Sequence, residues 1–275
     1  MKEEQLNKLT CKAIQASIEA GKATLQVFNE ENIEIQSKED NSPLTRADLL
    51  SNQEIKKMIS EFGIPLLSEE DKQVPYNIRS DWKIFWLIDP LDGTKEFINR
   101  SGEFTVNIAL IENNIPIAGV IYVPVLNELY FANKHIGSYK LNDASLNIDN
   151  KSLSSIIKTS LKLPLNIKNK MFNVVASKSH LSKETTDYID KLKEKINNID
   201  FVSKGSSLKL CLIAEGTADL YPRFGPTMEW DVAAGHAIVK YSGGKVFIVN
   251  TGTELSYNKE NLLNPFFIAE KVMAN

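Results

Sequence analysis

Cysteine is nearly missing from this chain, in which only Cys11 and Cys211 occur. Two thiols can build neither a disulfide framework nor a four-cysteine zinc site. We therefore expect both to be buried apolar side chains in a protein of a reducing compartment. The three histidines, His135, His180 and His236, match no zinc-ligand or catalytic-triad spacing, so we interpret each as structural, for lack of partners.

Long apolar runs and an excess of positive charge are also lacking. No run approaches the ~20 apolar residues of a spanning helix, and the opening MKEEQLNKLTCKAIQ lacks the apolar core of a signal peptide. We expect a cytoplasmic protein, and peripheral attachment to the cytoplasmic face of the inner membrane stays open. The formal net charge of −3, from 32 basic and 35 acidic residues, argues against a nucleic-acid polymer as partner. A small anionic substrate would need local positive charge or a bound metal.

Helix and strand patterns alternate along the chain, which predicts a layered α/β or α+β fold. The polar stretch 133–170 predicts a boundary between an N-terminal lobe, 1–150, and a C-terminal lobe, 151–275, that completes the site. A turn is expected between two strands at Asn113-Asn114. Helices are predicted over 4–29, 183–196, 206–216 and 230–244, with another from about residue 45, and strands over 84–90, 103–112, 117–132, 172–177, 218–224 and 244–250.

The stretch WLIDPLDGTKEF places two aspartates around a proline at the end of a predicted strand. Asp89, Asp92 and the carbonyl of Leu91 make an all-oxygen set of the kind that Mg²⁺ prefers. Carboxylates this close repel each other unless one is protonated or a cation lies between them. Gly93 and Thr94 offer backbone N–H groups at a helix start, a geometry that receives phosphate, and the Thr94 hydroxyl could orient water.

Other acids also end apolar elements. Asp48 and Asp231 begin predicted helices, and Glu69 and Glu70 follow the apolar run IPLL. Each has a simpler explanation when taken alone: a helix-start acid for Asp48, a solvated charge run for the glutamates, and a helix N-cap for Asp231. Glu69 could bridge a second cation, and two cations about 3.5–4 Å apart stabilise in-line phosphoryl displacement. We interpret the acids together as a metal site.

Three segments together resemble a known family. LLSEE, then WLIDPLDGTKEF, then EWDVAAG resemble, in order and separation, the motifs of the inositol monophosphatase superfamily: an upstream Asp, a Glu pair, D-P-[IL]-D-G-T and W-D-x-A-[AG]-G. The superfamily consists of metal-dependent, lithium-sensitive phosphatases. The resemblance covers nearly the whole chain. It implies a layered αβαβα sandwich of the inositol monophosphatase and fructose-1,6-bisphosphatase type, with the active site between two lobes.

The resemblance also implies roles for single residues. Asp48, Glu69 and Thr94 would be catalytic and hold the attacking water, while Glu70 would lie outside the direct contacts of the metal. Two or three Mg²⁺ per site are expected. The implied metal ligands are Glu69, Asp89, the Leu91 carbonyl, Asp92 and Asp231, and the implied substrate-binding residues are Leu91, Asp92, Gly93, Thr94, Ser206, Ser207, Arg223 and Asp231.

Within the superfamily, GSSLKLCLIAEGTADLYPRFGPT, WDVAAGHAI and LLNPFF resemble the bacterial 3′(2′),5′-bisphosphate nucleotidases. Ser206 and Ser207 match a segment near the sugar and the second phosphate of the substrate. Arg223 stands where inositol-directed members usually have Glu. Its planar guanidinium can donate paired hydrogen bonds to a phosphate or a base. A surface salt bridge is the simpler alternative for this residue. This likeness implies hydrolysis of the 3′-phosphate of adenosine 3′,5′-bisphosphate (PAP), or of the sulfonucleotide PAPS, in sulfur metabolism.

Two alternatives stay open at this point. One is an inositol monophosphatase or sugar bisphosphatase on the same scaffold, and the other is an inactive homologue that binds a phosphonucleotide. The choice between a monomer and a homodimer is also open.

Overall fold

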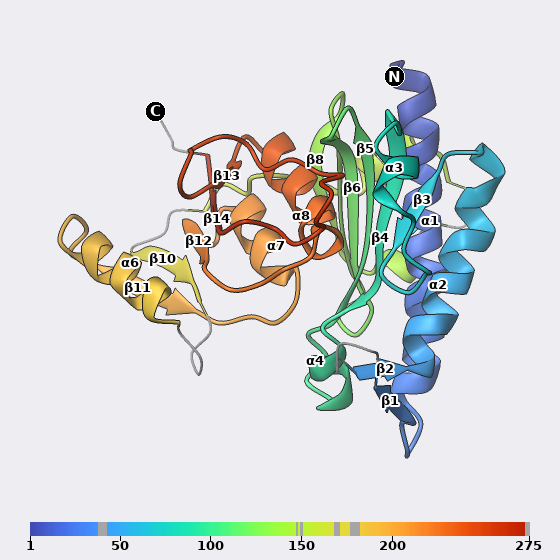
Figure 1. The fold of residues 1–275 in the computed structure, drawn as a ribbon, viewed down its shortest axis with the longest axis horizontal. Coiled ribbons are helices and arrows are strands. Elements are labelled where there is room, and N and C mark those ends of the chain that lie inside the picture. The colour runs from blue at the N-terminus through green and yellow to red at the C-terminus, as the bar shows by residue number, and fades with distance from the viewer. Residues whose placement is uncertain (38–42, 147, 149–150, 168–170, 177–181, 273–275) are drawn as a thin grey trace.

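A computed structural model describes residues 1–37, 43–146, 148, 151–167, 171–176 and 182–272. Its elements stack as layers in the order helices, sheet, helices, sheet, helix (Figure 1). The prediction of a layered αβαβα sandwich is therefore confirmed. Within the described residues, no helix is long and apolar enough to cross a membrane.

The N-terminal sheet contains seven strands in the order β3-β4-β5-β6-β7-β8-β9. β3 is parallel to β4, and every later neighbour is antiparallel. Asn113 and Asn114 have positive φ and form the predicted turn between β5 and β6. The strands are β3 (Leu66–Ser68), β4 (Ile84–Asp92), β5 (Thr105–Glu112), β6 (Ile115–Val123), β7 (Glu128–Asn133), β8 (Gly137–Leu141) and β9 (Leu161–Lys162).

Helices α1 (Glu3–Phe28) and α2 (Arg46–Ile59) cover one face of this sheet (Figure 1). Alternation along β4 sends Trp86 towards these helices and Leu87 towards the middle helix layer, so both faces of the strand are apolar and buried. The smaller elements of this half are β1 (Ile35–Ser37), β2 (Pro43–Thr45), η1 (Ser60–Phe62), α3 (Tyr76–Arg79), α4 (Thr94–Ile98), η2 (Ala144–Leu146) and α5 (Leu153–Lys158).

The second sheet contains five strands in the order β11-β10-β12-β14-β13. Helices α7 (Leu208–Glu215) and α8 (Glu229–Tyr241) lie between the two sheets, and α6 (Lys183–Lys193) covers the outer face of the second. Pairing is parallel from β10 to β11 and β12, and antiparallel from β14 to β12 and β13. The strands are β10 (Phe172–Val175), β11 (Ile199–Val202), β12 (Leu220–Arg223), β13 (Lys245–Ile248) and β14 (Phe267–Glu270).

The element boundaries differ from the prediction at functional places. The strand predicted to end at residue 90 continues to Asp92, and the helix predicted from residue 206 begins at Leu208. α5 and β9 follow residue 150 yet belong to the N-terminal half, because Ile156 packs in the same core as α1 and β9 pairs with β8. We therefore propose that the boundary between the lobes lies after β9 rather than at residue 150.

The cysteine and histidine predictions have mixed outcomes. Cys211 is buried, as expected, but Cys11 is only half-buried. His236 is buried and does have partners: its Nδ1 lies 2.9 Å from the Tyr257 hydroxyl, and its Nε2 lies 3.2 Å from a Glu254 oxygen. The expectation that it lacks partners is therefore wrong. His135 is exposed, and His180 lies outside the described residues.

Candidate active site

Three elements that are distant in the sequence bring carboxylates together. Glu69 follows β3, Asp89 lies near the end of the adjacent strand β4, and Asp231 lies in the first turn of α8. One carboxylate oxygen from each lies within 4.8 Å of the others. Glu70 does not belong to this trio, and the next acid, Asp71, forms an ion pair with Lys56 at 2.8 Å.

A β-bulge at Pro90 and Leu91 shapes the end of β4. Asp89 pairs with Asn107 and Asp92 pairs with Thr105, so three steps along β4 oppose two along β5. A bulge can accept proline in a sheet and redirects the side chains that follow it. The predicted turn between Asp89 and Asp92 is therefore a bulged strand, and both carboxylates still reach the site.

Burial and crowding perturb two of these acids. Asp89 is 1% exposed, and burial, followed by the charges of Glu69 and other nearby carboxylates, raises its pKa well above the usual value. Burial and the charge of Asp92 likewise raise the pKa of Asp231. An all-oxygen cluster with this excess of negative charge suits a hard divalent cation such as Mg²⁺, which would relieve the repulsion. The residues present therefore fit the metal that the sequence predicts.

Asp231 and Asp48 also serve as helix caps. Each is the third residue of its helix: Asp231 accepts a hydrogen bond from the Met228 N–H at 2.8 Å, and Asp48 accepts one from the Thr45 N–H at 2.8 Å. The interpretation of Asp231 as the N-cap residue is thus wrong, because the N-cap of α8 is Met228 and Asp231 lies three residues after it. In each carboxylate it is the Oδ2 that accepts the hydrogen bond of the cap.

The second oxygen of Asp48 faces the start of α4. Its Oδ1 lies 3.4 Å from the Thr94 hydroxyl, which also lies 3.4 Å from the Leu91 carbonyl oxygen. Gly93 precedes α4 with φ of +91°, a conformation that favours glycine, and a Cβ there would meet the Ser206 Cβ at 3.2 Å. The local backbone therefore requires the glycine of the D-G-T motif.

Asp92 links the two halves of the molecule. Its Oδ2 accepts hydrogen bonds from the Ser206 hydroxyl and the Ser207 N–H, both at 2.6 Å, and from the Asn107 amide at 3.4 Å. The Thr105 hydroxyl lies 2.7 Å from that of Ser206 and 2.8 Å from that of Ser207. One oxygen of Asp92 is therefore occupied by Asn107 and by the segment before α7, and within the described chain the other remains for a cation or a substrate.

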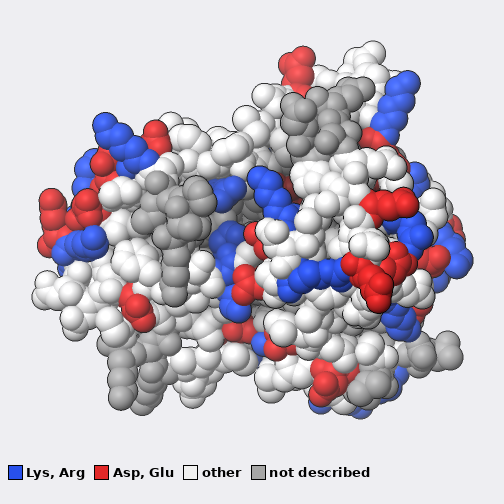
Figure 2. Space-filling view, turned by 90° about the horizontal axis from the view of Figure 1, so that it is seen from below, with Lys and Arg blue, Asp and Glu red and all other residues white. Residues whose placement is uncertain are grey.

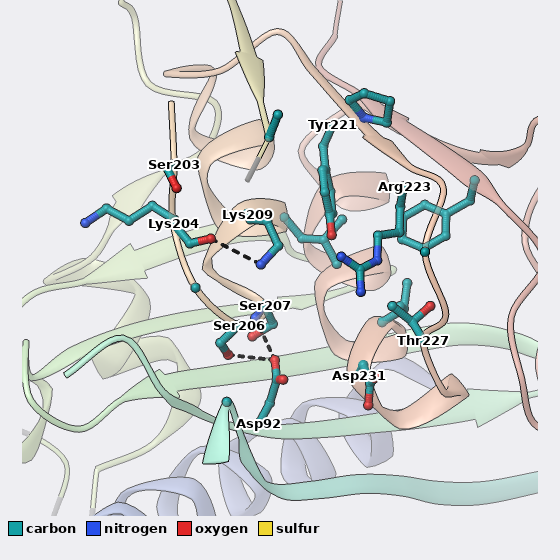
Figure 3. Close-up of a pocket in the computed structure, with 18 of the residues that line it drawn as sticks. Asp92, Ser203, Lys204, Ser206, Ser207, Lys209, Tyr221, Arg223, Thr227 and Asp231 are labelled. Carbon is teal, nitrogen blue, oxygen red and sulfur yellow. Dashed lines mark hydrogen bonds between the residues drawn. The ribbon is translucent and has the colours of Figure 1, made fainter. Parts of the chain in front are cut away.

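A cavity of about 480 Å³ opens beside these carboxylates. Basic side chains gather in the hollow on this face of the molecule, with acidic ones beside them (Figure 2). In Figure 3, Asp92 and Asp231 lie at one end of the cavity, with Ser206 and Ser207 pointing towards Asp92 and Arg223 on the opposite side. All five are among the residues expected to bind substrate, and the structure brings them together.

Two lysines of the cavity were missed by the sequence analysis. Lys204 and Lys209 flank the Gly-Ser-Ser segment, and basic residues on both sides of a tight turn before a helix were the signal available in the sequence. Lys204 pairs with Glu103 at 2.9 Å. Among the described residues, neither Lys209 nor Arg223 forms an ion pair; Lys209 donates to the Lys204 carbonyl and Arg223 to the Pro226 carbonyl. The salt bridge considered for Arg223 is therefore not formed within the described chain.

Comparison with curated proteins identifies similar sequences named 3′(2′),5′-bisphosphate nucleotidase CysQ. The protein of Salmonella typhimurium is 43% identical over 252 residues, which is 90% of this chain and 94% of the relative. The protein of Escherichia coli strain K12 is 42% identical over 252 residues, with the same two coverages.

Solved structures show the same fold. CysQ from Bacteroides thetaiotaomicron, described as a bacterial member of the inositol monophosphatase family, has 47% identity, a TM-score of 0.89 and 98% coverage of both chains. The extragenic suppressor protein suhB of Bartonella henselae, at 22% identity, has a TM-score of 0.72 over 96% of this chain and 94% of that one.

The sequence profile of the inositol monophosphatase family matches residues 5–273. That match spans both sheets and every acid of the site described above. The chain belongs to the inositol monophosphatase family.

Proposed function

We propose that this protein is a Mg²⁺-dependent 3′(2′),5′-bisphosphate nucleotidase. It removes the 3′-phosphate of adenosine 3′,5′-bisphosphate, or of the sulfonucleotide PAPS, to give the 5′-nucleotide and phosphate. The similarity to relatives of that name over 90% of the chain supports the activity. The observation that carries the choice of substrate is a cavity lined both by the carboxylates Asp92 and Asp231 and by Lys209 and Arg223, two cations that form no ion pair among the described residues.

The charge distribution in the cavity favours a substrate with two phosphates. The carboxylates Asp92 and Asp231 would repel a phosphate unless cations lay between them. Lys209 and Arg223 have no carboxylate partner among the described residues, so they offer a second anion site that needs no metal. We place the 3′-phosphate at the carboxylate end and the 5′-phosphate at the basic end.

The chain holds the groups that the reaction needs. We propose that Glu69, Asp89, the Leu91 carbonyl, Asp92 and Asp231 hold two or three Mg²⁺. When bound, Mg²⁺ lowers the pKa of water and neutralises charge on the phosphate. Asp48 and Thr94, whose oxygens lie 3.4 Å apart, orient the attacking water, and an Asp48 oxygen accepts its proton.

The groups around the phosphate and the water complete the proposed chemistry. The backbone at Gly93 and Thr94 receives the transferred phosphate. Glu69 supports the water from the other side. The 3′-oxygen of the ribose leaves with a proton from solvent, so no covalent enzyme intermediate forms.

The remaining expectations belong to the same proposal. We propose inhibition by Li⁺ and a role in sulfur metabolism, both by analogy with the family. The proposal also includes a cytoplasmic location, with attachment to the cytoplasmic face of the inner membrane left open, and a monomeric or homodimeric state.

Phosphate release from purified protein tests the assignment. We expect turnover of adenosine 3′,5′-bisphosphate to exceed that of inositol 1-phosphate by at least tenfold, and to disappear in EDTA. Higher turnover of inositol 1-phosphate or of fructose 1,6-bisphosphate would replace the substrate assignment. Binding of the bisphosphate without phosphate release in Mg²⁺ would show an inactive binding homologue.

Removing Arg223 tests the second anion site. Arg223→Ala should raise KM for adenosine 3′,5′-bisphosphate by about 10- to 150-fold, the loss expected for one charge-assisted hydrogen bond. KM for adenosine 3′-monophosphate, which lacks the 5′-phosphate, serves as the internal control and should change little. Equal losses for both substrates would show that Arg223 does not read the second phosphate.

A further inference from the structure

The segment that holds Asp92 is itself a strained turn. Ser206 has φ of +53°, in the left-handed region that side chains other than glycine rarely adopt. Its neighbours Ser203, Lys204 and Gly205 belong to no helix or strand, and α7 begins only at Leu208. Such a conformation persists only where surrounding contacts hold it. The hydrogen bonds to Asp92 begin at Ser206, so another contact must hold the residues before it.

Glu103 makes that contact from the N-terminal half. Its Oε2 accepts a hydrogen bond from the Gly205 N–H at 2.7 Å, and its Oε1 accepts one from the Lys204 Nζ at 2.9 Å. Glu103 and Asp92 thus receive the N–H groups of Gly205 and Ser207, on either side of the left-handed Ser206. The turn is bracketed by two carboxylates, both from the N-terminal half.

Close packing supports the same bracket. A Cβ at Gly205 would lie 3.0 Å from the Glu103 carbonyl oxygen and 2.9 Å from the Glu96 Cγ. Glycine is therefore needed here for close approach, and the backbone of the turn lies directly against the backbone of Glu103. Glu103 also lines the cavity beside the turn.

We propose that Glu103 is a positioning residue that fixes the 203–207 turn and, through it, the orientation of the Asp92 carboxylate. Glu103 does not touch the trio of Glu69, Asp89 and Asp231. It acts through the Gly205 N–H, so that Ser206 and Ser207 hold one oxygen of Asp92 and the other oxygen would be available to hold a cation. The role of Asp92 in this inference rests on the proposed function. The contact between Glu103 and the Gly205 N–H does not depend on that function.

Two variants separate the amide contact from the charge of Glu103. Glu103→Ala removes both hydrogen bonds. Glu103→Gln keeps a side-chain oxygen for the Gly205 N–H and loses the ion pair with Lys204. Glu112→Ala is the matched control: Glu112 accepts from the Met1 ammonium at 2.7 Å and from Lys134 at 2.8 Å, at the opposite end of β5 from Glu103.

Hydrogen–deuterium exchange of the metal-free protein is the first measurement. In Glu103→Ala, amides of the 203–208 peptide should exchange at least about tenfold faster than in wild type, while Glu103→Gln should stay within about threefold and Glu112→Ala should match wild type. This readout involves neither substrate nor metal, so it stands even if the assigned activity is wrong.

Mg²⁺ binding is the second measurement. The Mg²⁺ concentration for half-saturation, followed by calorimetry, should rise about tenfold or more in Glu103→Ala, the usual loss when a residue that orients a ligand is removed. In the same variant, the KM for adenosine 3′,5′-bisphosphate should rise by a smaller factor than the Mg²⁺ concentration for half-saturation. Unchanged exchange and Mg²⁺ affinity in Glu103→Ala would overturn the proposal. If Glu103→Gln loses as much exchange protection and Mg²⁺ affinity as Glu103→Ala, the ion pair with Lys204 holds the turn, and the proposed role of the Gly205 amide contact is wrong.

Discussion

Neutralising Asp89 should stabilise the metal-free protein while it removes activity. Asp89 is 1% exposed and lies among carboxylates, and burial and those charges raise its pKa. Its Oδ1 accepts a hydrogen bond from the Leu91 N–H at 3.1 Å, and the side-chain oxygen of Asn can accept the same bond. Asp89→Asn therefore removes repulsion at little structural loss.

The size of the effect follows from the distances. Asp89 has oxygens of Glu69 and Asp231 within 4.8 Å, and at an effective dielectric constant of ~20 two unit charges this far apart repel by about 3.5 kcal/mol. Partial protonation already relieves part of this repulsion, so we expect a net gain of about 1–3 kcal/mol in the free energy of unfolding. For a chain of this size the gain corresponds to a rise in Tm of about 2–5 °C.

Thermal melting in EDTA and in Mg²⁺ tests this expectation. Wild-type Tm should rise on addition of Mg²⁺, whereas Asp89→Asn should start higher in EDTA and respond little to the metal. Asp219→Asn is the matched control, because Asp219 is also buried but is paired with Lys271 and accepts the Asn173 N–H at 2.6 Å. Its Tm should fall. The reasoning is refuted if Asp89→Asn also melts lower in EDTA and keeps the wild-type response to Mg²⁺.

Further predictions concern pH, catalysis and stability. Burial raises the pKa of Asp89 and Asp231. In the metal-free protein, the stability gained from protonating them is therefore complete below the usual pKa of 3.8 and is lost as pH rises through the raised pKa values. Mg²⁺ affinity, measured by thermal shift across a pH series, should rise over the same pH range. Asp92→Asn should lose nearly all phosphate release and keep the wild-type circular dichroism spectrum; normal turnover would contradict its role. Glu229 is fully buried and accepts hydrogen bonds from the Lys259 N–H at 2.9 Å and from the Lys259 Nζ at 2.6 Å. Glu229→Ala should therefore lower the free energy of unfolding, measured by urea titration, by about 3–5 kcal/mol. A decrease of less than about 1 kcal/mol would contradict a stabilising ion pair.

Local sequence patterns predicted the main elements of the fold. Apolar periodicity located α1, β4, β5 and α8, and the Asn113-Asn114 turn followed from residues that tolerate positive φ. Strand β14 (Phe267–Glu270) was not predicted, and only its antiparallel pairing with β12 and β13 identifies it as a strand of the second sheet. The extension of β4 to Asp92 was missed because Pro90 normally ends a strand, and only pairing with β5 through a bulge keeps it in the sheet.

The sequence by itself determined the kind of chemistry. Oxygen ligands in Glu69, Asp89, Asp92 and Asp231 specify a hard cation, and the adjacent Gly93-Thr94 specifies an anion, since these preferences belong to the side chains and to the local backbone.

Only the tertiary structure decided which groups are shared and which remain available. Asp92 gives one oxygen to Ser206 and Ser207, and Glu103 occupies Lys204, while Lys209 and Arg223 stay unpaired within the described chain. These partners lie about a hundred residues apart in the sequence, and local periodicity carries no information on contacts across two lobes. The packing of α7 and α8 between the sheets brings them together, and so sets how charge is divided along the cavity.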